Sequence, residues 1–127
     1  MKKINYKKSA VSTINLQIQA LQKLKNSIGS SFGQAVKAIS ECNSKTILVG
    51  VGKSGHVASQ IAASLSSIGA PSFALSANDC SHGDLGSITK KDILILISNS
   101  GSTEELKPIL YYANRNKITL IGITAKK

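Results

Sequence analysis

Apolar side chains recur at helical spacing through the first part of the chain. The positions are separated by three, four or seven residues, as in Val11, Ile14, Ile18, Leu21 and Ile28. This periodicity is typical of an amphipathic helix. We predict one helix over residues 11–28, capped at its start by Ser12 or Thr13 and ended by Gly29, and a second helix over residues 31–42.

After residue 43, short apolar runs alternate with segments of helical spacing. Helices are predicted from Val57 onward and over residues 103–114, whereas residues 77–90, rich in Gly, Asp, Asn and Ser, are expected to form a loop. Strands are predicted at residues 46–50, 72–76, 92–98 and 118–123. Alternating strands and helices indicate an α/β fold, a three-layer α/β/α sandwich around a parallel sheet.

The change in apolar spacing after residue 43 also predicts that the chain is divided into two structural parts. Residues 1–42 form an N-terminal helical arm that packs on the domain or on a partner subunit, and residues 43–127 form the α/β domain. The sequence reaches Lys127 directly after the fourth predicted strand, where a doubly wound domain normally adds a covering helix. We therefore expect a domain that is incomplete at its C-terminus, whether by truncation, as a split gene product or because a partner completes it.

The net charge and the content of Arg and aromatic residues limit the kinds of molecule that the chain is expected to bind. The chain carries 16 basic and 6 acidic residues, a formal charge of +10, and only 4% aromatic residues. A basic surface attracts nucleic acids, anionic membranes or phosphorylated metabolites. Base readout favours Arg and single-strand platforms favour aromatic rings, and this chain has one Arg. A Lys-rich solvated surface is the better interpretation, and no nucleic-acid partner is predicted.

Neither a membrane nor an oxidising compartment is indicated. No apolar run approaches the roughly 18 residues of a spanning helix, and no apolar signal segment follows the basic start. The same acid-free start leaves an organelle transit peptide open as an alternative. Cys42 and Cys80 have neither metal-ligand nor redox spacing, which suits a reduced, intracellular protein.

Three loops follow predicted strands, at the edge where ligands bind in such sheets. The first, residues 50–55, reads Gly-Val-Gly-Lys-Ser-Gly and fits the GxGxxG pattern between a strand and a helix. Glycines let the backbone approach a phosphate at a helix N-terminus, where Lys53 would face the anion. The pattern alone is weak evidence, because a tight turn without a ligand and a solvated lysine would read the same way.

The second loop, residues 98–103, reads Ser-Asn-Ser-Gly-Ser-Thr and places four hydroxyl groups where a helix begins. Hydroxyl and amide groups bind phosphate without a metal, although one hydroxyl would suffice for a helix cap. The third loop, residues 80–86, carries His82 beside Gly and Asp, a candidate for proton transfer or for contact with a sugar hydroxyl. Glu105 lies in the first turn of the helix after the second loop, where an acid also suits the helix dipole.

Together these loops resemble the sugar isomerase (SIS) domain family, and more closely the arabinose-5-phosphate isomerases of the KpsF/GutQ type. The resemblance rests on three motifs in the right order: residues 50–56, 81–86 and 98–101. It spans about residues 10–127 and corresponds to the N-terminal part of family members. It implies a parallel, flavodoxin-like or Rossmann-like SIS sheet, truncated after the fourth strand. It also implies metal-independent interconversion of D-arabinose 5-phosphate and D-ribulose 5-phosphate through an enediol.

The same resemblance implies a set of site residues. Lys53 and Glu105 match catalytic positions, and His82 matches a substrate contact that is also a catalytic candidate. The turn at Gly69 and Ala70 matches a further substrate contact. Phosphate contacts are implied for Ser54, Ser98, Asn99, Ser100 and Thr103.

The resemblance implies no cofactor and no metal, because Ser76 stands where many relatives carry a zinc-binding His. It implies a cytoplasmic bacterial homo-oligomer, a dimer or tetramer, that supplies the precursor of the lipopolysaccharide or capsule sugar Kdo. The family has a further catalytic Glu and a His beyond the fifth strand, so we expect little isomerase activity from these 127 residues alone. A non-catalytic phosphosugar-binding module of a regulator is the alternative function, and a basic nucleic-acid binder is the less favoured third.

Overall fold

The computed structural model describes residues 4–80 and 83–126. The chain forms two compact units, Met1–Gln34 and Ala35–Lys127, which are described separately. The division falls within the second helix, whereas the sequence placed the boundary after residue 42. In the part of the chain that the structure describes, no helix has both the length and the apolar character needed to cross a bilayer.

The first unit contains the long helix α1 (Tyr6–Ser27) and the start of α2 (Ser30–Ser40). Both predicted helices are confirmed, but the predicted cap of the first is wrong. The side chain of Asn5 caps α1 by accepting a hydrogen bond from the backbone N–H of Lys8 at 3.0 Å. Ser12 and Thr13 lie inside the helix. The helix was predicted to begin too late because its first turn gives no apolar periodicity.

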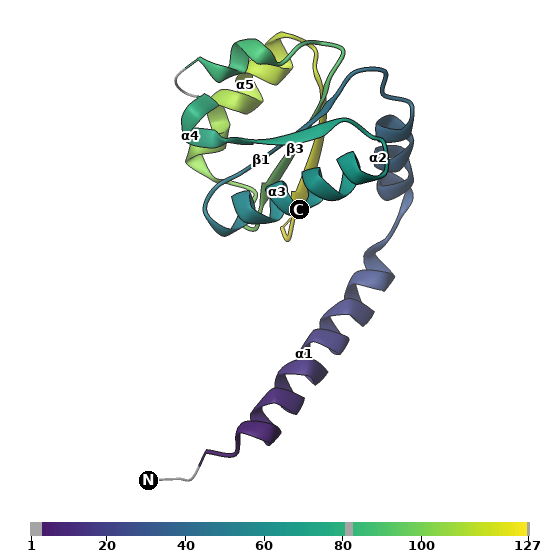
Figure 1. The fold of residues 1–127 in the computed structure, drawn as a ribbon, viewed down its shortest axis with the longest axis vertical. Helices are drawn as coiled ribbons and strands as arrows, with labels where there is room; N and C mark the ends of the chain where they lie inside the picture. Colours follow the sequence, from purple (N-terminus) through teal and green to yellow (C-terminus); the bar gives the residue numbers. More distant parts are fainter. Residues whose placement is uncertain (1–3, 81–82, 127) are drawn as a thin grey trace. The chain divides into compact units, whose positions relative to one another are not determined.

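The second unit is built on a four-stranded sheet (Figure 1). Its spatial order is β2-β1-β3-β4, and all three strand pairs are parallel. The strands are β1 (Thr46–Gly50), β2 (Ser72–Ser76), β3 (Ile93–Ser98) and β4 (Thr119–Thr124). Every residue of β1 and β3 is buried, as expected for central strands covered on both faces. The predicted α/β class with a parallel sheet is confirmed.

Helices cover both faces of this sheet, with α3 and α5 on opposite sides (Figure 1). Helix α3 (Lys53–Ser67) packs on Leu48 and Ile95, whereas α5 (Lys107–Arg115) packs on Ile47 and Leu94. Successive strand residues point to opposite faces, so each strand contributes to both cores. The three-layer arrangement follows directly from this alternation.

The segment between β2 and β3 differs from its prediction as a loop. It contains two short helical turns, α4 (Ala77–Cys80) and η1 (Asp84–Ser87). Ala77 and Cys80 are buried in the core beneath α5, and these apolar anchors fold the segment onto the sheet. The predicted helix after β3 is divided into a 3₁₀ turn, η2 (Glu104–Leu106), and α5, which begins at Lys107 and has Pro108 in its first turn. Proline is favoured there because the first helical N–H groups need no partner.

The turn between β1 and α3 depends on glycine. A Cβ atom at Gly50 would lie 2.5 Å from the backbone carbon and oxygen of Ser54, and one at Gly55 would lie 3.0 Å from the oxygen of Gly50. Gly52 has a φ of +57°, a left-handed conformation that favours glycine. The strand end and the helix start are therefore packed backbone against backbone.

At the opposite edge of the sheet, a buried carboxylate joins two segments of the chain. Asp92, 1% exposed, accepts hydrogen bonds from Ser44 Oγ (2.5 Å), Lys45 Nζ (3.1 Å) and the backbone N–H of Thr89 (2.7 Å). Burial by itself raises the pKa of Asp92, but these hydrogen bonds outweigh it and lower the pKa from 3.8 to about 2. The ionised carboxylate thus ties the segment before β1 to the start of β3.

The lowered pKa of Asp92 predicts a pH-dependent contribution to stability. The contribution is fully present above about pH 4 and is lost as the pH falls through the folded-state value of about 2. A shift of this size corresponds to about 2 kcal/mol, so Asp92→Asn should lower the free energy of unfolding by about that amount at pH 7. Urea unfolding at pH 7 and pH 2.5 should show the deficit shrinking in acid. The exposed Asp79→Asn is the control, and a deficit that is independent of pH would contradict the account.

The packing of Gly50 predicts a steric cost for any side chain at this position. Gly50→Ala should lower the free energy of unfolding by about 1–3 kcal/mol, because the added methyl meets rigid backbone. Gly86→Ala is the matched control, since a Cβ there has no neighbour within 4 Å among the residues that the structure describes. Equal effects of the two substitutions in urea unfolding would show that close packing at Gly50 is not the cause.

Candidate active site at the carboxyl edge of the sheet

The connections that leave β1 and β3 run to opposite faces of the sheet, β1 to α3 and β3 to α5. Such a reversal between neighbouring parallel strands opens a crevice beyond their carboxyl ends, where ligands of α/β proteins bind. Gly50 and Ile97 are register partners, so the loops that follow these residues are adjacent. The first two loops singled out in the sequence therefore flank one crevice.

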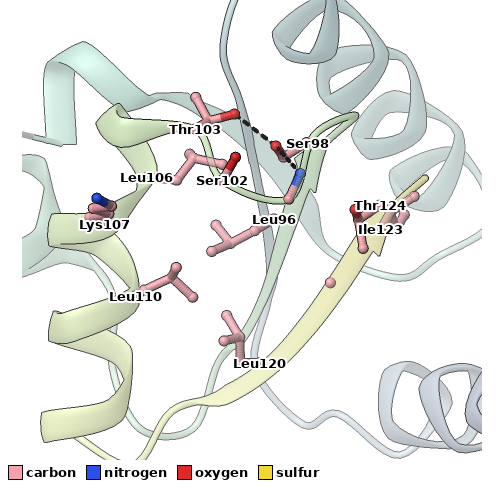
Figure 2. A pocket seen from close by; sticks show the side chains of 12 residues that line it. Leu96, Ser98, Ser102, Thr103, Leu106, Lys107, Leu110, Leu120, Ile123 and Thr124 are labelled. Atoms are coloured by element: carbon pink, nitrogen blue, oxygen red, sulfur yellow. Dashed lines mark hydrogen bonds between the residues drawn. The ribbon is translucent and has the colours of Figure 1, made fainter. Parts of the chain in front are cut away.

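The loop after β3 is held together by its own hydroxyl groups. Ser98, which is buried, lies with its Oγ 2.7 Å from Thr103 Oγ1 and accepts a hydrogen bond from the backbone N–H of Gly101 at 3.0 Å (Figure 2). Ser100 Oγ accepts from the N–H of Ser102 at 3.2 Å. Thr103 precedes η2, yet its side chain makes no capping hydrogen bond to that turn. Helix capping therefore does not account for these hydroxyl groups, which instead order the loop.

A cavity of about 320 Å³ opens beside this loop, between α5 and β4 (Figure 2). Its wall is apolar along the strands and α5, and polar at the loop. The apolar side chains are Leu96, Leu106, Leu110, Leu120 and Ile123, and the polar ones include Ser98, Ser102, Thr103 and Thr124. Ser54 and Ser100, which the sequence grouped with Ser98 and Thr103, are not among the described residues that line it.

Ser102 was counted among the four hydroxyl groups of the second loop but was given no contact of its own, and Thr124 was not singled out in the sequence. Thr124 is the register partner of Ser98, and its Oγ1 lies 3.0 Å from where a Cβ of Gly101 would stand. Its place as a hydroxyl residue at the end of a fourth parallel strand is the signal that would have indicated it.

The charged candidates lie at the same edge. Lys53 is the first residue of α3 and Glu105 belongs to η2, and both side chains are exposed. Glu104 forms an ion pair with Lys107 at 2.6 Å, whereas Lys53 and Glu105 have no ion pair within the described ranges. Ser54 is half-buried and Asn99 is exposed. Among the described residues, Lys53 and Glu105 are thus exposed charges without an ion-pair partner at the carboxyl edge of the sheet.

A second cavity, of about 340 Å³, lies between the start of α3 and the end of β2. The glycines of the first loop line it together with His56, Ser59 and Ser76. His56 belongs to the first sequence motif, but no role was assigned to it. Across the described residues, no group of three or more His, Cys, Asp and Glu side chains is placed to hold a metal ion.

The structure does not place two further predicted contacts, the turn at Gly69 and Ala70 and the side chain of His82, at the crevice. Gly69 and Ala70 lie at the amino end of β2, the opposite edge of the sheet, where their N–H groups bond to the last carbonyls of α3. This geometry is that of a helix C-terminus, and within one chain it is remote from the crevice, so their substrate contact stays a prediction. His82 lies outside the described residues, and its role also stays a prediction.

Comparison with known proteins agrees with this geometry. The family model described as "SIS domain" matches residues 38–127. Arabinose 5-phosphate isomerase KdsD of Francisella tularensis is 43% identical over 120 residues, which are 92% of this chain and 37% of that protein. Arabinose 5-phosphate isomerase GutQ of Escherichia coli is 37% identical over 114 residues, 90% of this chain and 36% of that protein.

Among solved structures, the protein c3406 of E. coli CFT073, in complex with arabinose 5-phosphate, superposes with a TM-score of 0.87 at 33% identity. The match covers 97% of this chain and 67% of that one. The chain thus spans little more than a third of the length of the curated relatives it matches. The family match over residues 38–127, together with the fold, shows that the chain belongs to the SIS domain family, as do the curated relatives KdsD and GutQ, which are named arabinose 5-phosphate isomerases.

Proposed function

We propose that the chain carries part of the active site of an aldose–ketose isomerase that interconverts D-arabinose 5-phosphate and D-ribulose 5-phosphate. The observation that carries the proposal is the hydroxyl-rich loop of residues 98–103, ordered by its own hydrogen bonds beside the crevice where the chain reverses between β1 and β3. The similarity to KdsD and GutQ supports this choice of sugar phosphate.

The phosphate is held by neutral donors in this proposal. The chain has a single Arg, Arg115, at the far end of α5, so an Arg clamp at the loop is not available. Hydroxyl groups of Ser98, Ser100 and Thr103 and backbone N–H groups of their loop supply hydrogen bonds, as at other anion-binding loops. Ser54, which lies at the start of α3, is proposed to donate a further hydrogen bond to the phosphate.

Isomerisation of the ketose moves one proton from C1 to C2 and one from the C1 hydroxyl to the C2 oxygen, through an enediol. A carboxylate within reach of C1 and C2 can carry the carbon-bound proton, and Glu105 is the candidate on this chain. A cation near the oxygens stabilises the negative charge that develops on them, which is the role we propose for Lys53. His82 is the further candidate for proton transfer between the oxygens.

The wider setting follows from the same proposal. The product D-arabinose 5-phosphate would serve synthesis of Kdo for lipopolysaccharide or capsule in a bacterial cytoplasm, and the protein would act as a homo-oligomer. A regulator module that binds a phosphosugar without turning it over is the alternative. The two functions share the phosphate loop and differ in whether Lys53 and Glu105 perform chemistry.

Loss of hydroxyl groups from the phosphate loop should weaken binding. The double variant Ser100→Ala/Thr103→Ala should lose roughly 1–3 kcal/mol of affinity for arabinose 5-phosphate, about 5- to 150-fold in Kd, because charge-assisted hydrogen bonds are removed. Isothermal titration calorimetry on the 127-residue chain measures this loss. Ser64→Ala, whose hydroxyl bonds within α3, is the control. Unchanged affinity in the double variant would remove the phosphate assignment.

The catalytic assignment needs an active protein. A chimera in which residues 1–127 replace the matching part of the Francisella relative should convert ribulose 5-phosphate in the presence of EDTA. In it, Lys53→Ala and Glu105→Gln should each lower kcat by more than about tenfold, whereas Glu104→Gln, the adjacent paired carboxylate, should not. An inert chimera that still binds the sugar phosphate would favour the regulator module. Full activity in both variants would refute their catalytic roles.

A further inference from the structure

Exposed cations gather at the amino edge of the sheet. Ile93 and Thr119 are register partners at the starts of β3 and β4, and Lys91 and Lys117 each come two residues before one of them. The segments that carry these lysines therefore lie side by side. Helix α5 ends at the same edge with Arg115, where a cation also suits the helix dipole. The four exposed cations are named here the amino-edge cluster: Lys90, Lys91, Arg115 and Lys117.

The carboxylates beside this cluster are already paired. Glu41 and Asp92 line one cavity together with Lys91. Glu41 lies 3.9 Å from Lys37 Nζ, and the buried Asp92 lies 3.1 Å from Lys45 Nζ. Within the described ranges, none of the four cations of the cluster forms an ion pair. Like charges closer than a Debye length, about 10 Å at 0.1 M salt, repel one another, so the cluster favours binding of an anionic partner.

Local backbone geometry gives no reason for lysine at three of these positions. Lys90 and Lys91 are the central residues of a turn that is closed by a hydrogen bond from the N–H of Asp92 to the carbonyl of Thr89, at 3.0 Å. Gly, Pro, Asn and Asp are the usual residues of such turns. Lys117 follows α5 with a φ of +53°, a left-handed conformation that favours Gly or Asn. In the described part of the chain, it is the one non-glycine residue with a positive φ. An unfavourable backbone conformation of this kind is retained where the side chain has a function.

A cavity of about 530 Å³ opens beside Lys91 at the same edge. It is large enough to receive a side chain of a partner, and its wall mixes apolar and polar groups. The apolar part of the wall is formed by Ala38, Cys42 and Ile93, and its acidic part by Glu41 and Asp92. Because of these two carboxylates, the cavity suits a neutral side chain better than an anionic group.

We propose that the amino-edge cluster binds an acidic segment of a partner protein. Asp and Glu side chains of the segment lie on the four cations, and a neutral side chain between them enters the cavity beside Lys91. A single-stranded nucleic acid would need aromatic rings for base stacking, and neither the cluster nor the cavity lining contains one. A lipid surface would contact the cations but leave the cavity unfilled. The surface lies at the opposite end of the strands from the hydroxyl-rich loop, so the partner and a sugar phosphate can bind together.

The test uses the 127-residue chain without any sugar phosphate, so it is independent of the proposed function. The probe is a fluorescein-labelled peptide, Glu-Glu-Asp-Leu-Glu-Glu-Asp-Glu, and its control carries Gln and Asn in place of Glu and Asp. Fluorescence anisotropy in 50 mM NaCl should give a Kd below about 100 µM for the acidic peptide and at least 20-fold weaker binding of the control. The Kd should rise at least fivefold in 200 mM NaCl because salt screens the charges. A chain that does not bind the acidic peptide at 1 mM would overturn the proposal.

Matched variants separate the cluster from the net charge of the chain. Lys90→Gln/Lys91→Gln should raise the Kd at least tenfold, whereas Lys107→Gln/Lys126→Gln, which removes the same charge at the carboxyl edge, should change it less than threefold. Lys117→Gly should raise the Kd at least threefold and also raise the midpoint of thermal unfolding, because glycine suits the left-handed conformation. Lys117→Arg, which keeps the charge, should bind within twofold of the wild type.

Other outcomes would contradict the proposal. Equal effects of the two double variants would show that net charge, and not the amino-edge cluster, attracts the peptide. A higher unfolding midpoint with unchanged affinity in Lys117→Gly would remove Lys117 from the surface. If the acidic peptide fails to bind while a thymidine 20-mer or phosphatidylglycerol vesicles bind, and that binding is lost in Lys90→Gln/Lys91→Gln, the cluster is a nucleic-acid or lipid surface instead.

Discussion

The reversal of the chain between β1 and β3 is the constraint on which the rest of the second unit depends. These two strands are parallel neighbours, fully buried, and their connections leave to opposite faces. Both faces must therefore be covered, by α3 on one side and α5 on the other. The same reversal leaves a crevice at the carboxyl edge. The glycines of the first loop and the hydroxyl groups of the second lie there because the strands end there.

The amino and carboxyl edges of the sheet differ in the role of their charged residues. At the amino edge, Asp92 is buried and accepts hydrogen bonds from Ser44, Lys45 and Thr89, which fixes the start of β3 against the segment before β1. At the carboxyl edge, Lys53 and Glu105 are exposed and have no ion pair in the described part of the chain. The residue that stabilises the fold, Asp92, and the proposed catalytic residues, Lys53 and Glu105, thus lie at opposite ends of the strands. Because of this separation, the loops at the carboxyl edge can carry unpaired charged side chains, which would be destabilising in a buried core.

Much of the fold could be predicted from the sequence because the strands and helices have local patterns of apolar and polar residues. Continuous apolar runs such as residues 93–97 indicate strands covered on both faces, and the alternation with helices fixes a parallel sheet. Three features have no such pattern. The cap by Asn5 precedes the apolar periodicity, the partners Ser44 and Lys45 lie 48 and 47 residues from Asp92, and the folded turns after β2 depend on burial of small residues. The site shows the same limit, since the loops were identified but the contribution of Thr124 to the cavity depends on strand register.

The central claim is that the loops beyond β1 and β3 bind a phosphosugar between them. The most direct measurement is a titration of the ¹⁵N-labelled chain with arabinose 5-phosphate, followed by amide chemical shifts, with unphosphorylated arabinose as the control. The account predicts saturable shifts concentrated in residues 50–56 and 98–105, absent with arabinose. Shifts concentrated elsewhere, or no shifts at millimolar ligand, would contradict it.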